Sequence, residues 1–245
     1  MRRIRADFMK IFKNKCSVPE LMSRLESKIV IIGAAGMLGH ALQREFPNAL
    51  LLDREPSGPR MDIVDITSID GLRDKIGHLR SGDWAINSSA FTQVDLAETE
   101  EGSTSSYNIN AGGPANLALL SAEQGFGIVH YSTDFVFDGR QGNYRETDRP
   151  NPLSNYAQHK LKGEGPVLDA GGFVLRTAYL YGPNGHGHFI DSVINLATKS
   201  SRREFVNDQI GSPTFSSDLA KMTKCMTENN DAVGPEIYHA VNDGR

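Results

Sequence analysis

From Lys28 onward, short apolar runs alternate with longer segments in which apolar residues recur at helical spacing. The run 28–33 (KIVIIG) has a continuous apolar centre, which is typical of a parallel strand covered on both faces. In the next segment Leu38, Leu42 and Phe46 recur at every fourth position, so the pattern predicts a helix over 37–46. The chain therefore opens with a strand followed by a helix.

The same alternation continues along the chain. It predicts further strands over 49–53, 84–87, 127–132, 173–177 and 237–241, and helices from 67 or 68 to about 79 and over 105–124, 155–164 and 189–200. This order predicts βαβ units and an α/β fold, a doubly wound parallel sheet. Two long stretches, 134–154 and 178–188, are rich in Gly, Pro and Asn, and such long loops are usually functional.

Composition narrows the classes of protein that fit this pattern. With 245 residues, 39% hydrophobic and 23% charged, the chain is globular rather than collagen-like, fibrous or disordered. Its two cysteines, Cys16 and Cys225, form no CxxC, which excludes a disulfide scaffold and a structural zinc site and favours a reducing cytosol. No apolar run approaches the roughly 18 residues that span a bilayer. We therefore expect a cytoplasmic protein with no membrane partner.

The charge is unevenly distributed along the chain. Residues 1–28 carry eight basic and three acidic side chains, a net charge of +5, whereas the remainder carries 18 basic and 27 acidic side chains, a net charge of −9. An acidic body argues against nucleic acid as a partner. We interpret residues 1–27 as a basic, disordered leader, and an Arg-rich organelle-targeting presequence is the alternative.

A glycine-rich turn joins the first predicted strand to the first predicted helix. Its sequence, Gly33-Ala34-Ala35-Gly36-Met37-Leu38-Gly39, is a GxxGxxG. Glycines permit a tight turn and let backbone N–H groups approach a pyrophosphate, which the helix N-terminus then stabilises. This context predicts a dinucleotide site, and an ordinary glycine-rich turn is the alternative.

Polar residues at the end of the second predicted strand bear on the choice of cofactor. Asp53 is placed to hydrogen-bond an adenosine ribose hydroxyl, as in NAD sites, whereas Arg54 is suited to the 2′-phosphate of NADP. Because both are present, the sequence leaves NADPH and NADH open. Asp65 and Ile66 are expected beside the adenine.

Tyr156 and Lys160 form a YxxxK on a predicted helix, so the two side chains share one helix face. A free tyrosine has a pKa near 10, and a neighbouring ammonium would lower it toward neutral pH. Thr133 ends a predicted strand at the carboxyl edge, where open α/β sheets bind ligands. A hydroxyl, a phenol and an ammonium converging beside a nicotinamide suit the reduction of a ketone.

Together these motifs resemble the extended short-chain dehydrogenase/reductases, and in detail the dTDP-4-dehydrorhamnose reductase family. The resemblance covers about residues 28 to 243. It is carried by the stretches 87–95 (NSSAFTQVD), 131–139 (YSTDFVFDG), 144–148 (YRETD), 151–156 (NPLSNY), 176–182 (RTAYLYG) and 207–214 (NDQIGSPT). The last of these is the most specific, since general sugar-nucleotide epimerases lack it.

The resemblance implies a role for each matching residue. The catalytic triad falls on Thr133, Tyr156 and Lys160. Cofactor contacts fall on Gly33, Gly36, Met37, Leu38, Gly39, Asp53, Arg54, Asp65, Ile66, Ser88, Ser89 and Ala90, as well as on Tyr156 and Lys160, and sugar contacts fall on Asp134 and Tyr179. It also implies a Rossmann-type NAD(P)-binding domain over 28–177 and a short substrate-binding region over 178–245, interleaved with late Rossmann elements.

The activity that the resemblance implies is reduction, by NADPH or NADH, of the C4 ketone of a nucleotide-activated 6-deoxy-4-keto sugar. A 4,6-dehydratase is disfavoured because Thr133 is followed by Asp134-Phe135, which lacks the second carboxylate. The remaining alternative is a non-catalytic NADP-binding subunit that resembles the methionine adenosyltransferase β subunit. Since the family continues for some tens of residues beyond Arg245, the chain is expected to be either a fragment or a shortened relative.

The last two properties on which the sequence bears are metal binding and oligomeric state. His186 and His188 lack a third ligand nearby, so we expect no metal site there. The sequence does not decide the oligomeric state, and a homodimer is one open alternative.

Overall fold

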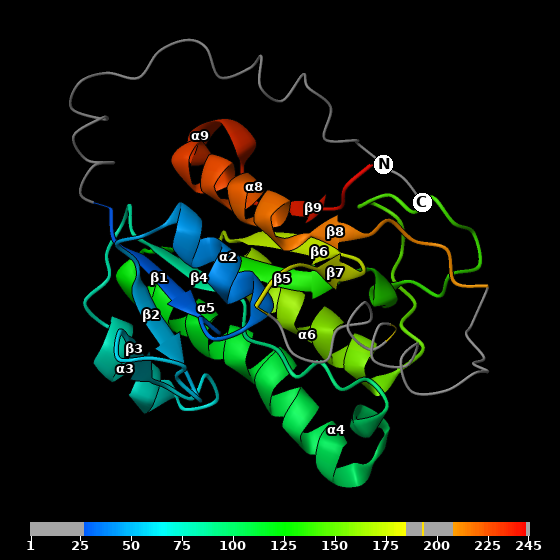
Figure 1. Cartoon of the computed structure of the whole chain (residues 1–245), viewed down its shortest axis with the longest axis horizontal. Helices are drawn as coiled ribbons and strands as arrows, with labels where there is room; N and C mark the ends of the chain where they lie inside the picture. Colours follow the sequence, from blue (N-terminus) through cyan, green and yellow to red (C-terminus); the bar gives the residue numbers. More distant parts are fainter. Residues whose placement is uncertain (1–26, 185–192, 194–207, 244–245) are drawn as a thin grey trace.

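The fold is built on one parallel sheet, seen in a computed structural model that describes residues 27–184, 193 and 208–243. Seven strands lie in the order β3-β2-β1-β4-β5-β6-β9, and every neighbouring pair is parallel. Their bounds are β1 (Ile29–Ile32), β2 (Leu50–Asp53), β3 (Met61–Ile63), β4 (Trp84–Asn87), β5 (Gly127–Thr133), β6 (Phe173–Thr177) and β9 (Ile237–His239). The predicted doubly wound parallel sheet is confirmed (Figure 1).

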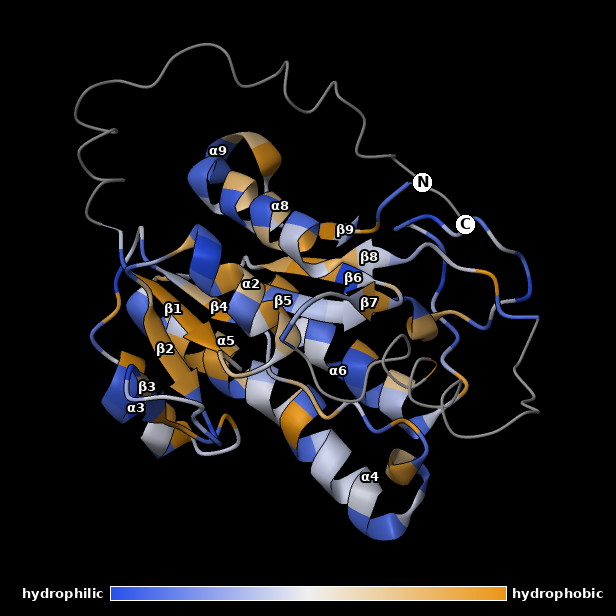
Figure 2. Cartoon of the chain, in the orientation of Figure 1, coloured by the Kyte–Doolittle hydropathy of each residue, from blue (hydrophilic) through white to orange (hydrophobic). Residues whose placement is uncertain are grey.

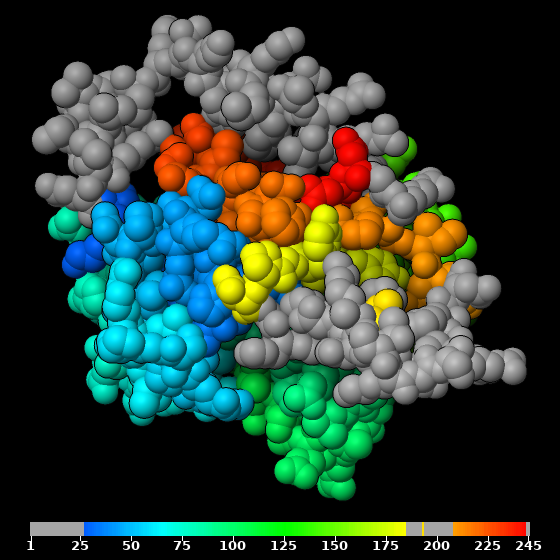
Figure 3. Space-filling view, viewed as in Figure 1, coloured from blue at the N-terminus to red at the C-terminus, as the bar shows by residue number. Residues whose placement is uncertain are grey.

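Helices cover both faces of the sheet. They are α2 (Met37–Glu45), α3 (Ile69–Ile76), α4 (Glu100–Tyr107), α5 (Gly113–Gln124), α6 (Asn155–Asp169), α8 (Ser216–Glu228) and α9 (Asn230–Val233). Helices α2 and α8 pack together on one face, and α3, α5 and α6 lie on the other (Figure 1). The space-filling view shows α2 in blue directly beside α8 in orange (Figure 3).

Alternation along the strands supplies both faces of the core. Successive strand side chains point to opposite faces of a sheet. Accordingly Ile31 packs with Leu38 of α2 and Leu219 of α8, whereas Val30 and Ile32 belong to the apolar cluster beneath α3 and α5. Figure 2 shows these central strands as predominantly hydrophobic. The continuous apolar run of the first strand is thus explained by burial on both sides.

The strand order reverses direction between β1 and β4. The chain proceeds from β1 to β2 and β3 on one side and from β4 to β5 and β6 on the other. Open α/β sheets bind ligands at the carboxyl ends of the strands, where the order reverses in this way. The glycine-rich loop after β1 and the loop after β4 both lie at that point.

The predicted helix over 105–124 differs from the structure. Helix α4 begins five residues earlier, because the Thr99 side chain accepts a hydrogen bond from the Gly102 N–H at 3.1 Å and caps it. A π-helical turn, η2 (Asn108–Gly112), then separates α4 from α5. One predicted helix is therefore two helices joined by a wider turn.

Other elements also differ from the prediction. Helix α6 continues to Asp169 through Pro166, although Gly165 and Pro166 are poor helix formers. The elements that the sequence pattern did not predict are the strands β3, β7 (Leu180–Tyr181) and β8 (Thr214–Phe215), the helices α8 and α9, and the short 3₁₀ turns η1 (Leu96–Glu98) and η3 (Asp134–Val136). The leader and, except for Val193, the predicted helix over 189–200 lie outside the described residues. Within the described residues, no helix is both long and apolar enough to cross a membrane.

Candidate active site

The three glycines of the loop after β1 have three different surroundings. Gly33 has φ +83°, and a Cβ there would lie 2.4 Å from the backbone nitrogen of Ser89. A Cβ at Gly39 would lie 2.3 Å from the Gly33 carbonyl oxygen, so only glycine lets α2 pack this closely on the loop. At Gly36 a Cβ would meet nothing closer than that same oxygen at 3.4 Å. Packing therefore requires the first and third glycines and leaves space at the second.

The first turn of α2 is suited to an anion. Its N-cap is the exposed Gly36, and the turn carries no acidic side chain. The first N–H groups of a helix lack intrahelical acceptors and attract negative charge. Leu38 is buried in the core, so its contribution to a phosphate is limited to its backbone, and Met37 is half-buried beside Gly182.

Asp53 supports the glycine loop directly. Its carboxylate accepts hydrogen bonds from the Ala35 N–H at 2.8 Å and from the Glu55 N–H at 3.0 Å. The structure thus gives the predicted ribose ligand a second task, which is to hold the phosphate loop against the end of β2. The neighbouring Arg54 side chain is 61% exposed and pairs with Glu55 at 3.2 Å.

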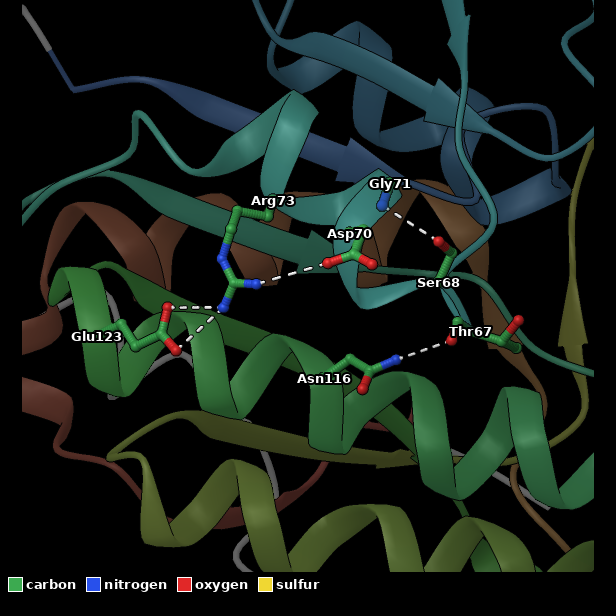
Figure 4. Close-up of polar contacts among 7 residues, drawn as sticks. All are labelled: Thr67, Ser68, Asp70, Gly71, Arg73, Asn116 and Glu123. Carbon is green, nitrogen blue, oxygen red and sulfur yellow. Dashed lines mark hydrogen bonds and ion pairs between the residues drawn. The ribbon is translucent and has the colours of Figure 1, made fainter.

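The loop after β3 is fixed to α5. Asp65 accepts hydrogen bonds from the N–H and the hydroxyl of Thr67, at 2.9 and 2.8 Å. The amide of Asn116 donates to the carbonyls of Ile66 and Thr67, and Figure 4 shows the contact with Thr67. The Ile66 side chain is buried in the core, so only its backbone can contribute to an adenine site.

Figure 4 also shows how α3 is held beside this loop. Ser68 accepts a hydrogen bond from the Gly71 N–H at 3.1 Å and caps α3, which decides between 67 and 68, the two starts that the sequence left open. Arg73 donates two hydrogen bonds to Glu123 of α5, at 3.0 and 3.1 Å. The predicted adenosine side therefore rests on two helices that are cross-linked to each other.

The loop after β4 is tied to the glycine loop. The Ser88 hydroxyl donates to the carbonyls of Ile32 and Gly33, at 2.9 and 3.1 Å. Ser89 donates to the buried Asn87 through its hydroxyl at 2.7 Å and its N–H at 3.2 Å, and Ala90 is exposed. The sequence analysis did not single out Asn87, although a polar residue ending an apolar strand was a usable signal.

A second asparagine missed by the sequence analysis, Asn110, anchors the far side of this loop. Its side chain accepts from the Phe91 N–H at 3.0 Å and donates to the Phe91 carbonyl at 2.9 Å. Asn110 lies in the π-helical turn η2 and is buried. The irregular turn thus directs a polar side chain toward the loop that lines the nicotinamide side of the predicted site.

The predicted acid–base residues meet at the carboxyl end of β5. Thr133 is the last residue of β5, and its hydroxyl lies close enough to Tyr156, in the first turn of α6, to influence the pKa of that phenol. Thr133 also donates to Asp134 at 3.3 Å and accepts from the Phe135 N–H at 3.2 Å. Lys160, one turn after Tyr156, is buried and donates to the Tyr131 carbonyl at 2.6 Å.

The pKa of Tyr156 differs from the expectation based on spacing. The pKa of its phenol is raised to about 12, mainly by burial; the Thr133 hydroxyl opposes this rise, and the negative charge of Asp134 contributes to it. Burial lowers the pKa of Lys160 to about 8. The YxxxK spacing predicted a lowered tyrosine pKa; that expectation is wrong, because burial disfavours the charged phenolate. The phenol is therefore held protonated, the form that can donate a proton.

The two predicted sugar contacts lie together on the open side of this centre. Burial raises the pKa of Asp134 to about 6, and its charge helps to raise the pKa of Tyr179. Tyr179 has φ +44°, and its hydroxyl donates to Gln209 at 3.4 Å. A Cβ at Gly211 would lie 2.3 Å from the Tyr179 ring, so the ring rests on the backbone of the segment that contains Gln209.

No metal centre is found in the part of the chain that the structure covers. There, no group of three or more His, Cys, Asp or Glu side chains is arranged to hold an ion. His186 and His188 lie outside the described residues.

Comparison with known proteins gives a consistent result. The family model described as "RmlD substrate binding domain" matches residues 27–245. The dTDP-4-dehydrorhamnose reductase of Mycobacterium tuberculosis is 36% identical over 234 residues, which is 91% of this chain and 72% of that protein. The spore coat polysaccharide biosynthesis protein SpsK of Bacillus subtilis is 34% identical over 89% of this chain and 74% of its own length. A solved structure of the dTDP-4-dehydrorhamnose reductase of Bacillus anthracis in complex with NADP is 32% identical, with a TM-score of 0.74 over 89% of this chain and 76% of that one.

Proposed function

This chain belongs to the RmlD substrate binding domain family, and from that membership we propose that it reduces the C4 ketone of a nucleotide-activated 6-deoxy-4-keto sugar with NAD(P)H. The observation that carries the proposal is the convergence of Thr133, Tyr156 and Lys160 at the carboxyl end of β5. This centre and the glycine loop lie at the same edge of the sheet, where a dinucleotide and a sugar can meet.

The residues present fit a nicotinamide dinucleotide. Packing leaves Gly36 free of close contacts at the N-terminus of α2, which is where a pyrophosphate would be held. Asp53 and Arg54 are the residues for the adenosine ribose and its phosphate, and Lys160 is the residue for the nicotinamide ribose. When bound, the cofactor supplies the hydride that adds to the carbonyl carbon.

The side chains of the protein stabilise the negative charge that develops on the carbonyl oxygen and supply the proton that this oxygen takes up. Tyr156, held protonated, donates its proton as the oxygen gains negative charge, and Thr133 donates a hydrogen bond to the same oxygen. Asp134 and Tyr179 hold the sugar on the open side of the centre. The sugar then lies between the acid and the hydride donor.

The alternative of a non-catalytic NADP-binding subunit is not favoured. Several curated relatives are named as reductases, and this chain carries Thr133, Tyr156 and Lys160, the catalytic set that the resemblance implies. The dehydratase alternative still lacks its second carboxylate after Asp134. A reductase is consistent with the names of the relatives, with the catalytic set and with the missing second carboxylate.

A turnover assay tests the proposal. Purified chain is mixed with dTDP-4-keto-6-deoxy-L-mannose, and consumption of NADPH and of NADH is followed by absorbance. Reduction with either cofactor supports the proposal. If calorimetry shows tight NADPH binding and the assay shows no turnover, the non-catalytic NADP-binding subunit becomes the favoured interpretation.

Three finer points belong to this proposal and await measurement. They are dTDP as the nucleotide, a homodimeric assembly and a cytoplasmic location. Competition with UDP-sugars tests the nucleotide. Sedimentation equilibrium tests the assembly, and cell fractionation tests the location.

A further inference from the structure

One face of α6 contacts the end of β5 at three successive positions. Tyr156, Lys160 and Glu164 are spaced four residues apart, so their side chains share this face. Tyr156 lies beside Thr133, and Lys160 donates to the Tyr131 carbonyl. Glu164 contacts the residue between them, which is Ser132. The first two members of this series belong to the proposed chemistry, and the third has no assigned task.

Glu164 is a buried carboxylate with a well-defined set of partners. The Ser132 hydroxyl donates to Oε1 at 2.6 Å. The Arg176 guanidinium of β6 donates to Oε1 at 2.9 Å and to Oε2 at 2.6 Å. Glu164, Ser132 and Arg176 are each no more than 3% exposed. A buried ion pair of this kind is weak evidence of a stabilising role, because an apolar replacement is often as stable.

The surroundings of Lys160 give Glu164 a consequence beyond packing. On α6, Lys160 shares one helix face with Tyr156 and Glu164 and is influenced by the Glu164 charge; from β5, it contacts the Tyr131 carbonyl and lies near the buried His130. Burial lowers the pKa of Lys160, and Glu164 is the carboxylate that opposes this by raising it.

The remaining titratable groups near Lys160 do not supply a second negative charge. Burial keeps the pKa of His130 low and raises the pKa of Tyr156, so both are neutral near pH 7. Arg176 is cationic, and its charge is paired with Glu164. Asp134 lies beyond Tyr156 and acts on that phenol.

We propose that Glu164 is a positioning residue for the reduction, and that its carboxylate, clamped by Ser132 and Arg176, keeps the buried Lys160 in its ammonium form. The proposal rests on the proposed function, in which Lys160 must be charged to hold the nicotinamide ribose and support Tyr156. Ser132 and Arg176 act indirectly, by fixing the carboxylate one helical turn from Lys160. The clamp thus sets the upper pH limit of activity.

The test compares charge removal with loss of a hydrogen bond at the same carboxylate. Glu164→Gln removes the charge and keeps the shape, whereas Ser132→Ala removes one hydrogen bond and leaves the Arg176–Glu164 pair charged. The Lys160 amine is followed by NMR in lysine-labelled protein between about pH 6 and about pH 10, a range that brackets its pKa of about 8. Lys160→Met assigns the resonance.

We expect Glu164→Gln to move the midpoint of the Lys160 NMR titration to lower pH. The pH at which kcat falls on the alkaline side of its profile should move in the same direction. Ser132→Ala, in which Arg176 still holds the charged carboxylate, should move both midpoints much less than Glu164→Gln does, and Glu164→Asp, which keeps the charge, should leave them near their wild-type values. Thermal stability falls in all three variants, so it does not discriminate. An unchanged Lys160 midpoint in Glu164→Gln, or an equal shift in Ser132→Ala, would overturn the proposal.

A second variant covers the case in which Glu164→Gln fails to fold because Arg176 is left buried without a counter-charge. In Glu164→Gln/Arg176→Gln both charges are removed, and the Lys160 midpoint should still move to lower pH. The NMR titration needs no substrate. If wild type reduces no keto sugar, the proposed function fails, and the titration still decides whether Glu164 controls the charge of Lys160.

Discussion

Alanine at two glycines of the phosphate loop should separate cofactor binding from folding. Gly36 has φ −74°, which any residue adopts, and its Cβ would lie 3.4 Å from the nearest atom, the Gly33 carbonyl oxygen. At Gly39 the Cβ would lie 2.3 Å from that oxygen and 2.5 Å from the Ala34 oxygen. Both neighbours are backbone atoms, so Gly39→Ala has to displace α2 from the loop, and Gly36→Ala does not.

The expected magnitudes differ accordingly. Overpacking costs about 1–3 kcal/mol of unfolding free energy in Gly39→Ala. In Gly36→Ala the poorer N-cap and the smaller entropy of the unfolded chain roughly cancel, leaving a change below about 0.5 kcal/mol. Its methyl group, however, would occupy the space that we propose for the pyrophosphate. Losing one charge-assisted hydrogen bond there costs about 1.5–3 kcal/mol, or roughly 10- to 100-fold in Kd.

Two measurements on each variant check this reasoning. Thermal or urea unfolding gives stability, and calorimetry with NADPH gives the Kd. Gly36→Ala should bind weakly and unfold like wild type, and Gly39→Ala should unfold early. If Gly36→Ala binds NADPH with wild-type affinity, the N-terminus of α2 does not contribute to cofactor binding. A loss of stability in Gly36→Ala as large as that in Gly39→Ala would mean that packing constrains both glycines.

Three further predictions concern the acid, the cofactor phosphate and a buried carboxylate. Tyr156→Phe should lower kcat by about 10²–10⁴ with nearly unchanged NADPH affinity, and stopped-flow rates that stay above about a tenth of wild type would reject the proton-donor role. Arg54→Ala should weaken NADPH by roughly 1–2 kcal/mol, a discounted value because this side chain is 61% exposed, and should leave NADH binding unchanged; equal losses in calorimetry would contradict a phosphate contact. The pKa of Asp134 is raised to about 6, so its stabilising effect is present below the unfolded value and lost as the pH rises through 6. Asp134→Asn should therefore gain of the order of 1–3 kcal/mol in unfolding free energy relative to wild type at about pH 8 and almost nothing near pH 4, and a pH-independent difference in urea melts would refute this.

The sequence predicted most of the sheet because its strands are buried on both faces. Residues 84–87 and 173–177 were predicted with the bounds that the structure gives, since each is a short, largely apolar run ended by polar residues. The first part of α4, 100–104, was missed because its sequence has no apolar period, although Thr99 is a residue type that favours an N-cap. Helix α8 was missed despite an apolar stripe that includes Leu219 and Met226, so that signal was available and unused.

Contacts between distant segments account for most of what the sequence could not predict in the site. The Asn110 side chain contacts Phe91 from a π-helical turn, and no pattern of residues in the sequence predicts that turn. Glu164 and Arg176 meet because α6 and β6 pack in one particular register, which depends on the whole sheet. Motif spacing finds residues on one element, and partners from separate elements require the fold.

The acid–base pair illustrates the remaining limit of spacing. The interval between Tyr156 and Lys160 places both groups on one face of α6, but their protonation depends on how deeply each is buried. Burial raises the pKa of the phenol to about 12 and lowers that of the amine to about 8, so the ordinary order of the two values is reversed and the ammonium becomes the stronger acid. The phenol then keeps its proton at neutral pH, as a donor to a carbonyl oxygen must, and the ammonium is the group close to losing its charge. The charge of Lys160, rather than that of Tyr156, is therefore what the surrounding carboxylates have to protect, and Glu164 is the one placed to do so.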